Sequence, residues 1–255
     1  MGATEIYAAI VGRAERSRCL MFHLSPTHGT VGLIYPFWVL RGPRRVTLID
    51  TGFSAAAAEQ RGIGDYRDPT ALLAEIGIDP AEVEQILVSH LHFDHFGVPE
   101  RFPNARFVVQ HDDVAYFSGA GATHPAGRLA DPASIASLAE LRRAGRLELL
   151  DGDKALGDGV SAVRVGGHTP GSQLIVLERQ GGQIVFACDA SHLYANVQTR
   201  TPSAIIYRYD EYQRGFAAIE RLATGGRWFP GHDPEILSHL TPVSESVYAL
   251  RDDAT

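Results

Sequence analysis

The segment SHLHFDHFG, residues 89–97, places His90, His92, Asp94 and His95 directly after the apolar run QILV. Three imidazoles and a carboxylate that leave a buried strand together would lose hydration at high cost unless a cation compensated them. If the chain stays extended past the strand, His90 and His92 point the same way and can bind one ion. Asp94 and His95 then remain for a second ion, so the segment predicts a metal site at the end of a strand.

Three further residues repeat this order of strand, ligand-type residue and turn: His168 in GGHTPGS, Asp189 in FACDAS and His232 in WFPGHDP. Residues far apart in sequence can converge where strands end at one sheet edge. Imidazole and carboxylate together suit Zn²⁺, with Fe, Mn or Co as substitutes. We predict ordinary hydrogen-bonded roles, without metal binding, for the histidines at positions 23, 28, 111, 124 and 239.

Strands and helices are predicted along the whole chain, which favours layered sheets and helices. Short β-branched runs predict strands over residues 44–50, 86–90, 105–110, 160–165, 173–178 and 183–188, with a hairpin turn at RQGGQ. Asp-Pro pairs predict helices capped by Asp68, Asp79 and Asp131, and YDEYQRGFAAIERLA predicts another. The Gly- and Ala-rich segment 116–131 predicts a mobile loop without a regular element.

Composition narrows the classes of function. The length of 255 residues fits a single domain over 1–255, and a net charge of −7 provides no basic surface for nucleic acid. Cys19 and Cys188 are too few for a disulfide framework, which favours a reducing compartment and a cytoplasmic protein. No apolar run reaches the roughly 20 residues of a membrane-spanning helix, so no membrane partner is expected.

The motifs HLHFDH, GGHTPG, CDAS and PGHD, in this order, resemble the metallo-β-lactamase superfamily, and within it the quorum-quenching N-acyl homoserine lactonases and related lactone hydrolases. The resemblance implies an α+β fold, an αββα four-layer sandwich of two facing mixed sheets flanked by helices. It also implies two zinc ions per chain. The residues that it assigns to one zinc are His90, His92 and His168, those for the other are Asp94, His95 and His232, and Asp189 bridges the two ions.

The same resemblance implies a carboxylic ester hydrolase that opens the ester bond of a small-molecule lactone. A metal-bridging hydroxide would attack the carbonyl, and Asp94 would relay a proton to the leaving group. Asp50 in LIDTG would orient a ligand imidazole, or it is a simple turn residue at a strand end. The loop 116–131 is predicted to line the substrate entrance.

One departure from the family pattern concerns the residues after Asp189. Such lactonases have a tyrosine three residues after the bridging aspartate, whereas DASHLY has His192 there and Tyr194 two residues later. Either side chain could contact the substrate carbonyl, and we predict that His192 does so.

Other functions remain open at this point. A thioesterase of glyoxalase II type shares the whole ligand set, and a non-catalytic metal-binding sensor module would retain it. A long-chain acyl homoserine lactone would need an apolar channel, with candidate walls in GLIYPFW, Phe96 and the loop 116–131. A compact aromatic or heterocyclic lactone would need stacking and polar contacts instead. The sequence leaves the oligomeric state open.

Overall fold

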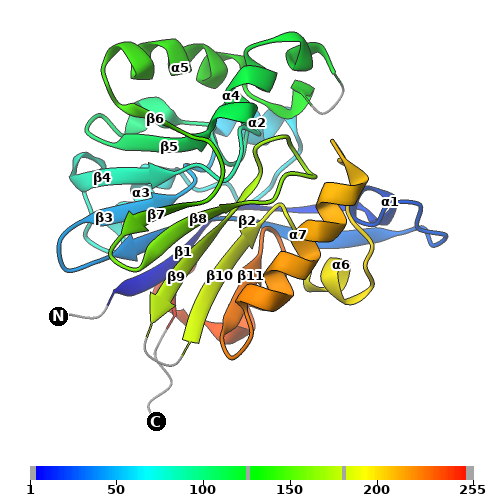
Figure 1. The fold of residues 1–255 in the computed structure, drawn as a ribbon. Coiled ribbons are helices and arrows are strands. Elements are labelled where there is room, and N and C mark those ends of the chain that lie inside the picture. The colour runs from blue at the N-terminus through cyan, green and yellow to red at the C-terminus, as the bar shows by residue number, and fades with distance from the viewer. Residues whose placement is uncertain (1–3, 125–126, 180–181, 251–255) are drawn as a thin grey trace.

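Two mixed β-sheets packed face to face form the centre of the protein (Figure 1). The computed structural model describes residues 4–124, 127–179 and 182–250. Within this part of the chain the first sheet has the strand order β12(Thr241–Pro242), β13(Val247–Leu250), β1(Glu5–Ser17), β2(Thr30–Arg41), β3(Val46–Ile49), β4(Val83–Leu87), β5(Arg106–Gln110), β6(Leu147–Leu150). The second has the order β11(Arg227–Pro230), β10(Gly182–Cys188), β9(Gln173–Arg179), β8(Val160–Arg164), β7(Lys154–Gly157).

Helices cover the outer faces of both sheets (Figure 1). The α-helices of the described residues are α1(Arg18–Met21), α2(Ala55–Gln60), α3(Pro69–Ala74), α4(His111–Phe117), α5(Pro132–Arg143), α6(Tyr194–Gln198) and α7(Tyr209–Leu222). Short 3-10 helices occur at η1(Pro80–Glu82), η2(Pro99–Arg101), η3(Ala120–Thr123), η4(Gly127–Leu129) and η5(Pro234–His239). No helix in the described ranges is long and apolar enough to cross a membrane.

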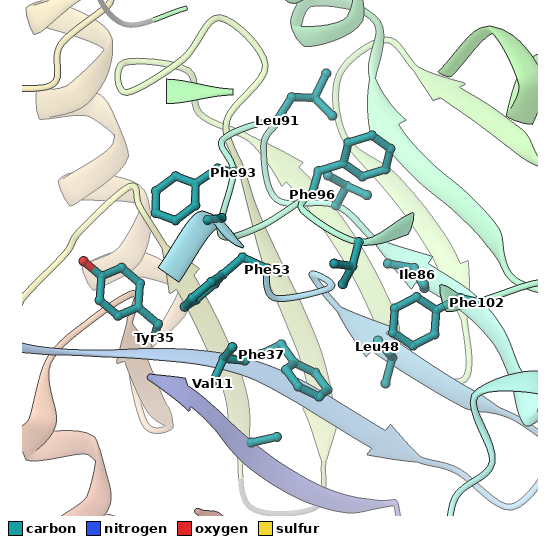
Figure 2. Close-up of a cluster of buried hydrophobic side chains, with 14 of the residues drawn as sticks. Val11, Tyr35, Phe37, Leu48, Phe53, Ile86, Leu91, Phe93, Phe96 and Phe102 are labelled. Atoms are coloured by element: carbon teal, nitrogen blue, oxygen red, sulfur yellow. The ribbon is translucent and has the colours of Figure 1, made fainter. Parts of the chain in front are cut away.

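Three apolar clusters show that the molecule has four layers. Neighbouring residues on one strand belong to different clusters, because strand side chains alternate between faces. Leu48 packs against the helices outside the first sheet, whereas Ile49 lies between the sheets. Val176 packs under α7, whereas Leu177 lies between the sheets. Figure 2 shows part of the helix-covered cluster of the first sheet, including Phe37, Phe53 and Phe102. The predicted αββα sandwich is therefore confirmed.

Strand direction brings the carboxyl ends of several strands to the same edge of each sheet. In the first sheet β3, β4 and β5 run parallel to one another. In the second, β10 runs parallel to β11, and β8 and β10 are both antiparallel to β9. The segments that follow these strands therefore start from matching edges, and all the predicted site residues lie in them.

The predicted elements differ from the structure at several places. The helix expected after Asp79 is only η1: its capping box is present, but the chain then enters β4, whose residues are mostly buried in the sheet. The long strands β1 and β2 were not predicted. The segment 116–131 contains the end of α4 as well as η3 and η4, so the prediction of no regular element was wrong. The turn at RQGGQ includes positions 180–181, which lie outside the described residues.

Candidate metal centre

The segment that follows β4 is held by hydrogen bonds on both sides before it reaches the histidines. The Gln173 side chain donates to the Val88 carbonyl (2.7 Å), and the backbone N–H of Ser89 donates to Asp50 (2.7 Å). A Cβ atom at Gly97 would lie 2.6 Å from the Gly52 carbonyl oxygen, so this close approach requires glycine. These contacts hold residues 89–97, which we call the histidine segment, in one conformation.

Two groups of buried side chains meet at this edge, and their potential ligand atoms lie within 4.8 Å of one another in each group. The first group is His90, His92, His168 and Asp189, and the second is Asp94, His95 and His232. The structure thus brings together all seven residues that the sequence predicted as metal ligands. A third overlapping group consists of Asp189, His192 and His232.

The carboxylate of Asp189 lies between the groups and offers one oxygen to each. Its Oδ2 is 3.2 Å from His168 Nε2 and 3.8 Å from His90 Nε2. Its Oδ1 is 2.9 Å from His232 Nε2 and 3.4 Å from His95 Nε2. This is the arrangement that a carboxylate bridging two ions would need.

The second ring nitrogen of several imidazoles contacts a fixed acceptor, which orients the first toward the centre. His95 Nδ1 lies 2.7 Å from Asp50 Oδ2, His168 Nδ1 lies 3.0 Å from the Ile205 carbonyl, and His232 Nδ1 lies 2.9 Å from the Ile34 carbonyl. An Nδ1–H that donates to such an acceptor leaves the lone pair of Nε2 free for a metal ion. Asp50 has a φ of 69°, so an unusual backbone conformation accompanies this carboxylate.

The residues present fit a pair of divalent cations. His95 Nε2 and Asp189 Oδ1 are buried and lie close to other groups of the centre, yet neither atom forms a hydrogen bond of favourable geometry within the described residues. His92 Nδ1 lies 2.9 Å from His90 Nε2 and 3.0 Å from His168 Nε2. A tetrahedral zinc ion with Zn–N bonds of about 2.0–2.1 Å would hold its ligand nitrogens roughly 3.3 Å apart. The donor atoms are therefore spaced close to what one ion requires.

Burial and charge determine the protonation of these groups. Burial lowers the pKa of His90 and His92 well below the usual value, so both are neutral ligands at physiological pH. Burial alone would raise the pKa of Asp94, but His95 and His232 outweigh it and lower that pKa to about 2. For His95, burial opposes the charge, yet the carboxylates of Asp94 and Asp189 raise its pKa well above normal. A cation at the centre would replace the proton that these carboxylates attract to His95.

The structure separates the two candidates that follow Asp189. His192 is buried in the centre, with Nε2 3.2 Å from Asp189 Oδ2. The Tyr194 hydroxyl instead donates to the Trp228 carbonyl (3.1 Å), and its ring packs on Trp228 in a different cavity.

A cavity of about 310 Å³ opens onto the metal centre. His92, Asp94, Asp189, His192 and His232 of the candidate centre line it. Its walls contain Leu20, Met21, Leu33, Tyr35, Phe93, Leu129 and Ile205 together with Arg16 and Arg61. From the predicted walls, Leu33 and Tyr35 in GLIYPFW and Leu129 in segment 116–131 line this cavity. Phe96 packs against Phe107 in the core instead.

Sequence reasoning missed Asp113, a buried carboxylate on α4 that joins the two loops carrying His92 and His168. Its Oδ2 accepts from the Leu91 N–H (3.1 Å), and its Oδ1 accepts from the Gly171 N–H (2.6 Å). Burial raises the pKa of Asp113 to about 6. Its only signal in the sequence is an acidic pair at the start of a helix, which is common on exposed surfaces.

A family model described as the metallo-beta-lactamase superfamily matches residues 31–245. An N-acyl homoserine lactonase of Azorhizobium caulinodans is 28% identical over 229 residues, which cover 78% of this chain and 82% of that protein. An N-acyl homoserine lactonase of Bacillus thuringiensis subsp. kurstaki is 27% identical over 207 residues, covering 73% of this chain and 78% of that protein.

Solved structures show the same fold. An N-acyl homoserine lactone hydrolase with the product N-hexanoyl-L-homoserine bound at its catalytic metal centre superposes with a TM-score of 0.78. It is 22% identical, and the match covers 92% of this chain and 96% of that chain. A dizinc quorum-quenching lactonase superposes with a TM-score of 0.75 at 17% identity, covering 92% of this chain and 89% of that chain.

Proposed function

Because the chain belongs to the metallo-β-lactamase superfamily, we propose that it is a dinuclear metal-dependent hydrolase that opens the ester bond of a lactone. The observation that carries the proposal is the Asp189 carboxylate, whose two oxygens face two separate sets of imidazoles. The lactonase names of the relatives from Azorhizobium and Bacillus support the substrate class.

In this proposal His90, His92 and His168 would hold one ion, and Asp94, His95 and His232 would hold the other. Asp189 would be shared by both ions. Neutral imidazoles and carboxylates suit zinc, and Fe, Mn or Co can take its place. Two such ions, when bound, would lower the pKa of a water molecule and so supply a hydroxide nucleophile at neutral pH.

Asp94 faces the cavity and provides a proton-transfer group. Its pKa is lowered to about 2 because His95 and His232 outweigh the effect of burial, so the side chain is ionised at neutral pH. An ionised carboxylate can accept a proton and deliver it to the alkoxide that leaves when the ring opens.

As in His95, His168 and His232, the Nδ1 atom of His192 contacts a group outside the centre. The Tyr212 hydroxyl donates to the Asp189 carbonyl (2.8 Å) and lies 3.3 Å from His192 Nδ1. Since that hydroxyl proton is used, Nδ1–H is the donor to Tyr212, and the Nε2 lone pair faces the centre. We therefore assign His192 a contact with the metal ions, and not the hydrogen-bond donation to the substrate carbonyl that a tyrosine would provide.

A substrate panel tests the proposal. Zinc-loaded protein is assayed against N-hexanoyl-homoserine lactone, a γ-butyrolactone, a glutathione thioester and a β-lactam, with metal analysis of the same preparation. We expect ring opening of a lactone to be fastest, and Asp189→Asn to abolish it while the protein stays folded. Faster thioester cleavage would favour the glyoxalase II type, and no turnover of any substrate by metal-loaded protein would favour a sensor.

A further inference from the structure

Two arginine side chains lie together in the wall of the active-site cavity. Arg16 comes from β1, and Arg61 follows α2. The Arg16 Nη2 donates to the Arg61 carbonyl (2.8 Å), so the two residues are fixed side by side. The two residues are therefore neighbours in the cavity wall.

The Arg61 guanidinium is held in place by stacking and not by a direct ion pair. Its central carbon lies 3.8 Å from the centre of the Phe93 ring, and Phe93 stands between His92 and Asp94 in the histidine segment. Its Nε is buried and has no hydrogen-bond partner in the described residues. Among these residues no carboxylate forms an ion pair with Arg16 or Arg61, whereas Arg67 pairs with Glu75 and Arg164 pairs with Asp112.

The charges of the other groups in the cavity also bear on the two arginines. Asp94 and Asp189 are the acidic groups that line it, and Asp94 is the acid that acts most strongly on Arg61. Two divalent ions would more than neutralise both carboxylates. The two guanidinium groups then remain positively charged, without a carboxylate of the described residues in ion-pair contact, inside a protein whose net charge is −7.

Resting on the function proposed above, we propose that Arg16 and Arg61 form an anion subsite that selects lactones carrying a carboxylate beside the ring ester. A guanidinium matches a carboxylate through paired hydrogen bonds, and a partly buried one binds it more strongly than a solvated one does. The cavity of about 310 Å³ is at the small end for a ligand site, which favours a compact anionic lactone over one with a long acyl chain.

A purely structural role for Arg61, holding Phe93 in place, would affect all substrates equally. The test therefore compares γ-carboxy-γ-butyrolactone with its primary amide, which has nearly the same shape but no charge. Ring opening is followed with the zinc-loaded protein, and the dissociation constants of both compounds are measured by calorimetry. The variants are Arg16→Gln, Arg61→Gln and Arg61→Lys. Arg18→Gln is the control, because Arg18 also stacks on a phenylalanine, Phe22, but does not line the cavity.

We expect the wild type to have a higher kcat/KM for the acid than for the amide. Arg61→Gln should lower this ratio by about tenfold or more, the usual effect of losing a charge-assisted hydrogen bond. Arg16→Gln should also lower the acid-to-amide ratio. Arg61→Lys should retain part of the preference for the acid, and Arg18→Gln should leave the ratio unchanged. Zinc content is measured for every variant.

An unchanged ratio in both glutamine variants, or a wild type that prefers the amide, would overturn the anion subsite while leaving lactone hydrolysis intact. If no lactone is opened at all, the proposed function fails, and calorimetry still decides the subsite. Tighter binding of the acid that is lost in Arg61→Gln would support it, and equal binding of acid and amide would overturn it.

Discussion

In four imidazoles of the centre, the hydrogen-bond partner of Nδ1 determines whether Nε2 can bind a metal ion. Asp50, Ile205 and Ile34 provide the acceptors for His95, His168 and His232. Tyr212 provides the acceptor for His192. A backbone carbonyl or a carboxylate at this distance keeps the proton on Nδ1, so the Nε2 lone pair is available to a cation. The tautomer thus follows from residues distant in sequence.

Replacing His192 and Tyr194 separately tests this account. We expect His192→Ala to weaken zinc binding by about 10–100-fold, the range found when a group that supports a metal site is lost, and to lower turnover. Tyr194→Phe should leave zinc content and turnover unchanged, because its hydroxyl contacts Trp228 away from the cavity, and should cost about 1 kcal/mol of stability. Competition with a chelator and steady-state kinetics measure both effects. Impaired turnover in Tyr194→Phe alone would refute the assignment.

Asp113 makes stability depend on pH in a predictable direction. Burial raises its pKa in the folded protein to about 6, above the ordinary value of 3.8. The folded state therefore holds the proton more tightly, and the stability due to this group is complete below about pH 4 and lost as the pH rises through about 6. The loss is on the order of 1–3 kcal/mol.

The variant Asp113→Asn stays neutral and should not show this loss. The unfolding free energy of the variant relative to wild type should therefore rise between about pH 4 and about pH 7. Urea unfolding of both proteins at the same zinc concentration measures the difference, in which other titrating groups cancel. A difference that is constant with pH would show that folding does not raise the pKa of Asp113.

A site residue could be predicted from the sequence only where its partners lie close to it in the chain. His90, His92, Asp94 and His95 form a group within six positions, so the chemistry was visible before any fold was known. Asp113 acts through backbone groups of Leu91 and Gly171, and nothing near it in sequence indicates those partners. The directions of His192 and Tyr194 depend on a turn whose geometry the residue types alone do not determine.

At the scale of elements, the short strands rich in β-branched residues were predictable from the sequence. The long N-terminal strands β1 and β2 were not. In β1 the first half is buried on both faces, while the second half carries Arg13, Glu15 and Arg16 where the strand extends past the core. Neither half shows a clear alternation of apolar and polar residues, which is the usual signal of a strand. After Asp79 the local capping signal was correct, but burial of Val83, Ile86 and Leu87 in the sheet determined what followed.

The segment 116–131 is expected to control which lactones enter. The Leu129 side chain lines the cavity, and its carbonyl accepts from the Phe93 N–H (2.9 Å), so this segment is tied to the histidine segment. Replacing η3 by two glycines should change the relative kcat/KM across a series of lactones by severalfold while zinc content stays the same. Kinetics over the series measure this, and an unchanged profile would mean that the segment is only a connection.

At the scale of the whole molecule, the centre joins the two sheets. His90, His92, Asp94 and His95 follow a strand of the first sheet, whereas His168, Asp189 and His232 follow strands of the second. The sequence indicated that each candidate follows a strand. That both sets meet at one edge depends on strand order and direction, which only the family resemblance implied in advance. Ions that bind this junction would also stabilise the packing of one sheet on the other.

The central claim is that two metal ions on this centre open a lactone. The most direct measurement is a titration of metal-free protein with zinc, during which the ring-opening rate of the best lactone in the panel is recorded. We predict that metal-free protein is inactive and that the rate reaches its plateau at about two ions per chain. Full activity without metal, or a plateau at a single ion, would contradict the account.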